Sequence, residues 1–256
     1  MDLSPSSSEA LSGKINALID AALEAENAAQ ERRTYLGASR IGVECERRLG
    51  FEYHGHDGEP FPGKAIRRFR LGHLHEDETV RWLRLAGFDV RTHTADGKQW
   101  GFSLADGRFA GHTDGIIAGG PNVRGLVYPC QWEHKIMKAS SWAGTVKNGV
   151  RKAHPEYWAQ CQIYMRQFGL EFALFTALNT DTSELLFEVI DYDADAAERL
   201  IEKAARIIES ASPMELPRVA SVETDYRCRF CPFSGQCWAA PKATIDAPRP
   251  SWLTRA

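Results

Sequence analysis

The sequence predicts an α/β protein in which helices cover both faces of a mixed sheet. Apolar residues recur at helical spacing through much of the first 86 residues. The period changes to that of strands between residues 88 and 136. Two helical segments, two strand segments and an amphipathic helix follow up to residue 211. This alternation of helical and strand segments is typical of a sheet packed between helices.

The first third of the chain is expected to be helical. Residues 9–35 carry apolar side chains at three- and four-residue spacing. Ser39 is expected to cap a second, short helix that carries Cys45. A turn-rich loop at residues 54–63 leads to a long helix at 64–86, which ends at Gly87 in a C-cap position.

The middle of the chain predicts the sheet. Strand-like segments separated by Gly, Asp or Pro cover residues 88–94, 99–104, 108–117 and 126–136. Helices are expected at 140–148 and 155–168, a hairpin at 172–178 and 184–190, and an amphipathic helix at 194–211. Residues 213–217 form a linker to a cysteine-rich end.

Bulk composition favours no particular partner. The 256 residues are 43% hydrophobic and 25% charged, with a formal net charge of −3. An anionic ligand would therefore need a local basic patch or bound metal ions. No apolar run approaches the ~20 residues of a membrane helix, and the first residues lack the order of a secretory signal. We expect a cytoplasmic protein without a membrane partner, in which the six cysteines are reduced.

Two carboxylates and a lysine form a candidate metal site. Asp114 ends an expected strand, and Glu133 and Lys135 share one face of a later strand while His134 faces the other way. Carboxylates that converge would repel each other unless a cation such as Mg²⁺ or Mn²⁺ lay between them. A lysine there can orient or deprotonate a metal-bound water and neutralise charge on a phosphate, as phosphodiester hydrolysis requires. Glu-x-Lys alone is a weak motif that also suits a solvated strand end.

Two helical motifs agree with this chemistry. The stretch Gly72-His-Leu-His-Glu76 lies on the long helix, so that one of its side chains can reach the site. Gln160 and Tyr164 lie one helical turn apart on a later helix, where they can grip a DNA strand or hold the lysine. A half-buried helix with polar edges would give the same pattern.

In the order of these motifs, the chain resembles PD-(D/E)xK nucleases of the RecB-type exonuclease superfamily. The resemblance covers roughly residues 39–238 and is nearest to phage exonucleases and the Cas-four family of CRISPR adaptation nucleases. It implies a restriction-endonuclease-like fold, with Asp114 and Glu133 as metal ligands and Lys135 as the catalytic lysine. The first motif fits either Glu76 or His75, which point about 100° apart on a helix. We favour Glu76.

Cys228, Cys231 and Cys237 follow a spacing that lets thiolates converge on one metal. Spacing alone allows zinc or an iron–sulfur cluster, and the flanking aromatic residues make a dry shell that suits a cluster. The resemblance implies a four-iron cluster (4Fe-4S) with Cys45 as the fourth ligand and zinc as the less favoured occupant. Cys130 and Cys161 are expected to pack in the core.

Basic and aromatic residues surround these motifs and suggest a phosphate-tracking groove, although ordinary solvated helix faces would look alike. The basic residues are Arg67, Arg68, Arg70, Arg81 and Arg84 on the long helix and Lys138, Lys147, Arg151 and Lys152 after the lysine strand. Trp142, Tyr157 and Trp158 are candidates for base stacking or for core packing.

Together these features predict a metal-dependent DNA nuclease of the exonuclease type. We expect a helical segment at 1–63, a PD-(D/E)xK core at 64–212 and a cysteine-cluster segment with a tail at 213–256. The alternative is a non-cleaving protein that binds DNA ends or acts as an adaptor on the same fold. Recombination proteins and CRISPR adaptation proteins are both candidate partners, and a second copy of the chain, in a homo-oligomer, is a third.

Overall fold

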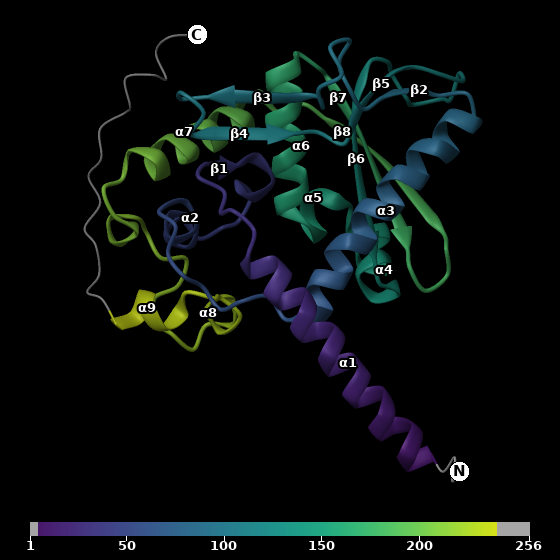
Figure 1. Cartoon of the computed structure of the whole chain (residues 1–256). Coiled ribbons are helices and arrows are strands. Elements are labelled where there is room, and N and C mark those ends of the chain that lie inside the picture. Colours follow the sequence, from purple (N-terminus) through teal and green to yellow (C-terminus); the bar gives the residue numbers. More distant parts are fainter. Residues whose placement is uncertain (1–4, 240–256) are drawn as a thin grey trace.

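The computed structural model describes residues 5–239, with side chains from residue 8 onward. Helices occupy both faces of a five-stranded sheet (Figure 1). Its strands, in spatial order, are β2 (Asp89–Arg91), β5 (Gly115–Gly119), β6 (Cys130–Met137), β7 (Phe172–Asn179) and β8 (Leu185–Asp191). Only β6 and β7 are parallel, so the expected mixed sheet is confirmed.

A second, three-stranded sheet accompanies the first. It consists of β1 (Leu36–Gly37), β4 (Phe109–His112) and β3 (Gly101–Leu104), in that spatial order. The single strand expected at residues 108–117 is therefore wrong. The chain leaves β4 at His112 and enters β5 at Gly115, because the two halves pair with different neighbours.

Two apolar clusters cover the two faces of the five-stranded sheet. On one face, Val80 and Leu83 of α3 (Gly63–Leu85) pack with Ile117 and Trp132. The other face carries the second cluster, in which Phe175 packs with residues of α5 and α6. Helices on this side are α4 (Ala139–Asn148), α5 (Val150–Ala153) and α6 (Pro155–Phe168). Pro155 begins α6, as the sequence predicts.

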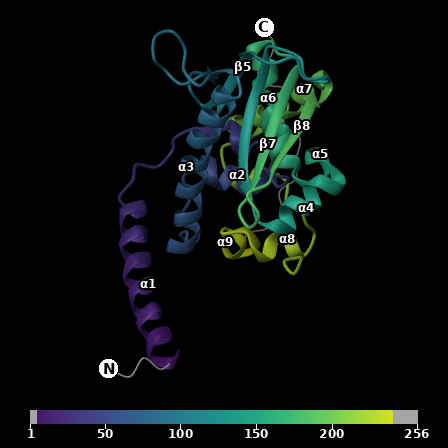
Figure 2. The ribbon, with the colours of Figure 1, turned by 90° about the vertical axis from the view of Figure 1, so that its right-hand side faces the viewer.

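The first helix of the described chain and the remaining helices complete the fold. Helix α1 (Pro5–Ala28) projects from the body and packs on the first half of α3, whose Arg67 and Arg70 pair with Asp20 and Glu26 (Figure 2). The remaining helices are α2 (Glu46–Tyr53), α7 (Ala194–Glu209), α8 (Tyr226–Arg229) and α9 (Ser234–Ala239). None of the helices within residues 5–239 is both long and apolar enough to span a bilayer.

One predicted helix start is wrong. Ser39 lies in a 3₁₀ turn at Ala38–Arg40, and the short helix begins only at Glu46, with Cys45 in the N-cap position. The turn is buried through Ala38 and packs against α6, so tertiary contacts rather than a helix cap fix this segment.

Candidate functional site

The acid–lysine group assembles where the two sheets meet. Asp114 lies in the two-residue connection between β4 and β5, and Glu133 and Lys135 lie on β6. The Nζ of Lys135 contacts Oε1 of Glu133 and lies 3.8 Å from Oδ2 of Asp114. Three residues from two separate parts of the sequence thus converge on one point.

Glu76 belongs to the same electrostatic group. Burial and the charge of Asp114 raise the pKa of Glu76 to about 7, and Glu76 in turn acts on Glu133. The Oε2 of Glu76 lies 3.8 Å from Nδ1 of His73, whose side chain is largely exposed. The ring of His75 is not among the charges of the described residues that act on Glu76 or Glu133.

The carboxylates lack sufficient positive charge. Glu133 is fully buried, and burial together with Asp114 raises its pKa to about 8. Burial alone would lower the pKa of Lys135, but Glu133 and Asp114 outweigh it and raise that pKa. A buried acidic group that one lysine does not fully neutralise favours additional cationic charge. The oxygen donors of Glu76, Asp114 and Glu133 suit Mg²⁺ or Mn²⁺.

The acids are paired with the lysine and do not form a closed coordination shell. Between residues 8 and 239, no three His, Cys, Asp or Glu side chains are grouped as metal ligands. Lys135 is the direct counterion of Glu133 instead. A cation that binds the acids would have to share or displace this contact, since Lys135 reaches both Glu133 and Asp114.

Buried donors orient the two carboxylates of the sheet. The Nε2 of Gln131 donates to Oε2 of Glu133 at 3.1 Å, and the backbone N–H of His134 donates to Oδ2 of Asp114 at 2.8 Å. Gln131 is itself fully buried. Sequence reasoning missed it, although its two-residue offset from Glu133 places it on the same strand face.

Tyr164 and Gln160 are both buried, at 1% and 5% exposure. The hydroxyl of Tyr164 donates to the carbonyl of His112 at 2.6 Å and so fixes the strand end ahead of Asp114. The side chain of Gln160 has no hydrogen-bond partner among the described residues. The lysine lies over a different ring, that of Tyr157, at 5.4 Å from its centroid.

The face of β6 that points away from Glu133 carries His134, which is buried. Burial lowers its pKa to about 3, so the ring is neutral. Its Nδ1 lies 2.8 Å from Oγ1 of Thr176 on β7, and its Nε2 lies 3.3 Å from Oγ1 of Thr79 on α3. The prediction that His134 faces away from Glu133 and Lys135 agrees with these contacts.

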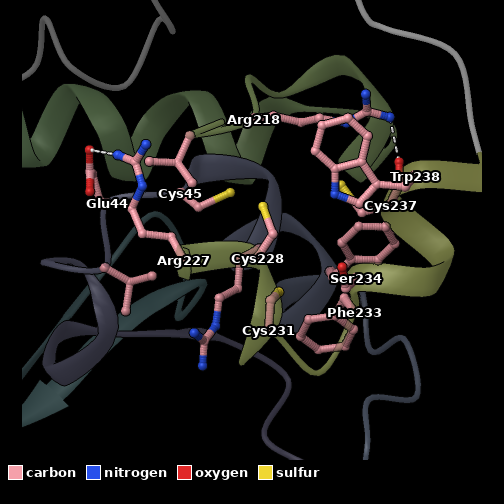
Figure 3. A pocket seen from close by; sticks show the side chains of 14 residues that line it. Glu44, Cys45, Arg218, Arg227, Cys228, Cys231, Phe233, Ser234, Cys237 and Trp238 are labelled. Carbon is pink, nitrogen blue, oxygen red and sulfur yellow. Dashed lines mark hydrogen bonds and ion pairs between the residues drawn. The ribbon is translucent and has the colours of Figure 1, made fainter. Parts of the chain in front are cut away.

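The four predicted cluster cysteines line one cavity of about 200 Å³ (Figure 3). Cys45 comes from the start of α2, Cys228 from α8, Cys237 from α9, and Cys231 from the connection between the last two. All four are free thiols. Cys45 thus lines the same cavity as cysteines about 180 positions later in the sequence, without a disulfide bond between them.

The chemistry of this cavity fits a sulfur-rich metal centre. Phe51 and Phe233 stack with centroids 5.2 Å apart at one side. Burial raises the pKa of Cys228, and a hydrogen bond from the buried indole N–H of Trp238 opposes that rise. A buried donor beside thiols suits hydrogen bonding to cluster sulfur. Arg48 and Arg227 also line the cavity and supply positive charge toward thiolates.

Cys130 and Cys161 lie elsewhere, in the clusters that cover the sheet. Both are fully buried, and burial raises the pKa of Cys130 to about 12 and the pKa of Cys161 well above its usual value. Neither thiol ionises at neutral pH, so both behave as small apolar side chains.

Several of the basic residues considered for a phosphate groove are already engaged. Arg67 and Arg70 hold α1, and Arg84 donates to the carbonyl of Val90. Arg81 pairs with Glu78 and Arg151 with Asp193. In the described part of the chain, four exposed basic side chains of the predicted set have neither an ion pair nor a hydrogen bond, namely Arg68, Lys138, Lys147 and Lys152. Trp142, Tyr157 and Trp158 are half-buried and pack on the core.

Comparison with known proteins places the fold. No family model matches the sequence, and no curated protein matches it. An alkaline exonuclease (LHK-Exo) from Laribacter hongkongensis has a TM-score of 0.50 and 16% identity over 69% of this chain and 87% of its own. Its complex with dAMP gives a TM-score of 0.49 and 17% identity over the same shares of the two chains.

A third solved structure, SSO0001, gives a TM-score of 0.47 and 16% identity. The match covers 87% of this chain and 95% of that one. At such identities the exonuclease match establishes the fold alone. The chain therefore has the restriction-endonuclease-like α/β architecture that the order of its motifs implied.

Proposed function

We propose that this protein is a Mg²⁺- or Mn²⁺-dependent deoxyribonuclease of the exonuclease type. The observation that carries the proposal is the contact of Lys135 with Glu133 and its approach to Asp114, with Glu76 coupled to both acids. The fold shared with an alkaline exonuclease supports it. The substrate class is DNA, processed in recombination or in CRISPR adaptation.

Each residue of the group has a distinct role in this proposal. Asp114, Glu133 and Glu76 would hold the cation, and the electrostatic coupling of Glu76 to both acids supports its choice over His75. When bound, the divalent ion supplies Lewis-acid activation of the phosphate and of the attacking water. Lys135 neutralises charge that develops on the phosphate, and Tyr164 keeps the Asp114 strand end in place.

The cysteine cavity would hold a 4Fe-4S cluster through Cys45, Cys228, Cys231 and Cys237. The presence of the four free thiols in the lining of one cavity, and the indole donor of Trp238 beside Cys228, support this choice. Zinc is the alternative occupant, since four thiolates also suit a tetrahedral zinc site. The role of the cluster would be structural, because it joins the segment before the nuclease core to the segment after it.

Digestion of end-labelled DNA with Mg²⁺ or Mn²⁺ tests the nuclease. We expect stepwise shortening from the ends by the wild-type protein and none by Lys135→Ala, with Lys98→Ala as a matched control because Lys98 is an exposed lysine paired only with Asp96. Binding of DNA ends without any cleavage, at either metal, would instead favour the adaptor function.

A further inference from the structure

A chain of buried hydrogen bonds runs from β7 through β6 to α3. The indole Nε1 of Trp132 donates to Oγ1 of Thr176 at 3.1 Å, and that hydroxyl lies 2.8 Å from Nδ1 of His134. On the other side of the ring, Nε2 lies 3.3 Å from Oγ1 of Thr79, which donates to the carbonyl of His75 at 2.7 Å. Thr79 and Thr176 are 1% and 0% exposed, so water does not compete.

The donors and acceptors of this chain fix its direction. The hydroxyl of Thr79 gives its hydrogen to the His75 carbonyl, so it can only accept from Nε2–H of His134. Nδ1 is then the acceptor of the ring, and the hydroxyl of Thr176 donates to it at 2.8 Å, a shorter distance than the 3.3 Å to its other acceptor, the carbonyl of Glu133. One neutral tautomer of His134 therefore satisfies every member of the chain.

The chain of hydrogen bonds ends beside the acid–lysine site. The carbonyl that it reaches belongs to His75, the residue next to Glu76 on α3. The backbone N–H of His134 holds Asp114 at the same time, and the flanking positions of β6 are Glu133 and Lys135. His134 is thus the one described residue that is bonded both to the helix of Glu76 and to Asp114.

We infer that His134 and Thr79 are positioning residues, which hold the Glu76 helix against the Asp114–Glu133 strand pair so that the three carboxylates can share one divalent ion. This inference rests on the proposed function. The cation binds the ionised carboxylates, and ionised carboxylates that converge in a buried place repel one another and push their supporting elements apart. A hydrogen-bonded link between those elements resists the separation before the cation binds, and it orients a ligand from behind as outer-shell partners do in metal sites.

The matched pair Thr79→Val and Thr79→Ser tests the link. Valine keeps the shape of threonine without its hydroxyl, and serine keeps the hydroxyl. We expect Thr79→Val to raise the Mn²⁺ dissociation constant about tenfold, as removal of such partners does, and Thr79→Ser to leave it within about twofold. Calorimetric titration with Mn²⁺ measures this without a need for turnover. Equal weakening in both variants would overturn the inference.

The same pair in a Glu76→Ala background separates positioning from general loosening of the fold. If the link acts through Glu76, Thr79→Val then has no further effect on the Mn²⁺ dissociation constant. An unchanged tenfold effect in that background would show that the hydroxyl matters only for overall stability, and would also overturn the inference.

If Thr79→Val does not fold, a second pair of variants, His134→Gln and His134→Asn, tests the link. The side chain of glutamine is long enough to reach Thr79, and that of asparagine is not. We then expect about tenfold weaker Mn²⁺ binding with asparagine alone, and equal binding would overturn the link.

Hydrogen exchange of the metal-free protein distinguishes a failed link from a failed metal site. The amides of residues 76–83 should exchange faster in Thr79→Val than in Thr79→Ser, and equal rates would overturn the link. Wild-type protein that binds no Mn²⁺ would overturn the proposed metal site instead, while the exchange rates still decide on the link.

Discussion

The acid–lysine site and the cysteine cavity are held together in different ways. The acids and the lysine are carried by paired strands and a long helix, and buried side chains such as Gln131 fix their orientation. The cysteines sit at the ends of short helices, above a small core of Phe51, Phe233 and Cys237. The sheet can build the first region without its metal, whereas the proposed ligation by thiolates would supply much of the cohesion of the second.

The two sides of the cysteine cavity are also unequal. The Cys45 side is clamped to α7, because Lys203 donates to the carbonyls of Ile41 and Val43, and Arg206 pairs with Glu46. Burial lowers the pKa of Lys203 to about 8, so the clamp weakens in alkaline solution. The side of the later cysteines packs on α2 through the stack of Phe233 on Phe51 in a small apolar cluster, so a bound metal should stabilise that side most.

The largest expected effect is loss of cleavage without loss of fold. Asp114→Ala and Lys135→Ala should each reduce divalent-dependent cleavage at least ~1,000-fold, the scale on which removal of an electrostatic catalytic group acts. Lys135 lowers the pKa of Glu133, which burial and Asp114 raise to about 8, so removal of Lys135 leaves Glu133 protonated and uncharged near neutrality and the fold survives. Gel-based cleavage rates and thermal melting of the same samples measure both outcomes.

Cleavage at the wild-type rate in either variant would contradict the catalytic assignment. Loss of cooperative thermal unfolding in Lys135→Ala would contradict the claim that the sheet holds this region together without the lysine.

The opposite pattern, loss of fold before activity, is expected at the cysteine cavity. If the proposed cluster is present, the wild-type protein should be brown and contain iron. Cys45→Ser should lose both, and should lower stability by up to roughly 5 kcal/mol, the cross-link value for a loop of about 180 residues. Cys161→Ala is the matched control, since its thiol is buried in the sheet core and should not bleach the protein. Iron analysis and thermal melting decide.

Stoichiometric zinc without iron would refute the iron–sulfur cluster, but the four cysteines would still cross-link the two segments through a metal. Unchanged metal content and melting temperature in Cys45→Ser would refute the cross-link itself.

A smaller effect separates the two candidates on α3. Glu76→Ala should lower cleavage about 100-fold at fixed Mn²⁺, since loss of a ligand costs 10- to 100-fold or more in affinity. His75→Ala should lower it less than about tenfold, because its ring does not act on Glu76 or Glu133. Rates at equal metal concentration test the ranking, and the reverse order would give the ligand role to His75.

The smallest effect is a pH dependence of metal binding. The pKa values of Glu76 and Glu133, about 7 and about 8, are raised, so both acids hold protons near neutrality in the metal-free protein. Because the cation needs the ionised forms, its affinity should rise with pH up to about 8 and then level off. Mn²⁺ titrations at several pH values measure this, and affinity that is flat across that range would contradict it.

The sequence predicted the regular elements well where a helical or strand pattern continued over a long segment. The helix expected at 155–168 has those bounds, and the hairpin of β7 and β8 lies within one residue of its expected place. Asp114 was expected to end a strand within residues 108–117, but the division of this segment between two sheets was not predicted, because it depends on pairing with different neighbours. A pattern reports the period of a segment but not which neighbour it pairs with.

The support of the site could not be predicted in the same way. His134 bonds to residues 55 and 42 positions away, so nothing in its local sequence marks its partners. The arginines of α3 looked free for DNA contact, yet Arg67 and Arg70 pair with acids of α1. Tertiary contacts of this kind depend on how helices dock, which spacing along one helix does not determine.

The distance between Cys45 and its three partners has a consequence for how the chain is made. At ~5–20 residues per second, a ribosome takes roughly 10–40 s to pass from the first cluster cysteine to the next. A nascent chain interrupted between Lys135 and Cys228 would carry the acids and the lysine but only one of the four thiols. If the proposed cluster forms, its presence would therefore mark a chain synthesised at least as far as Cys237.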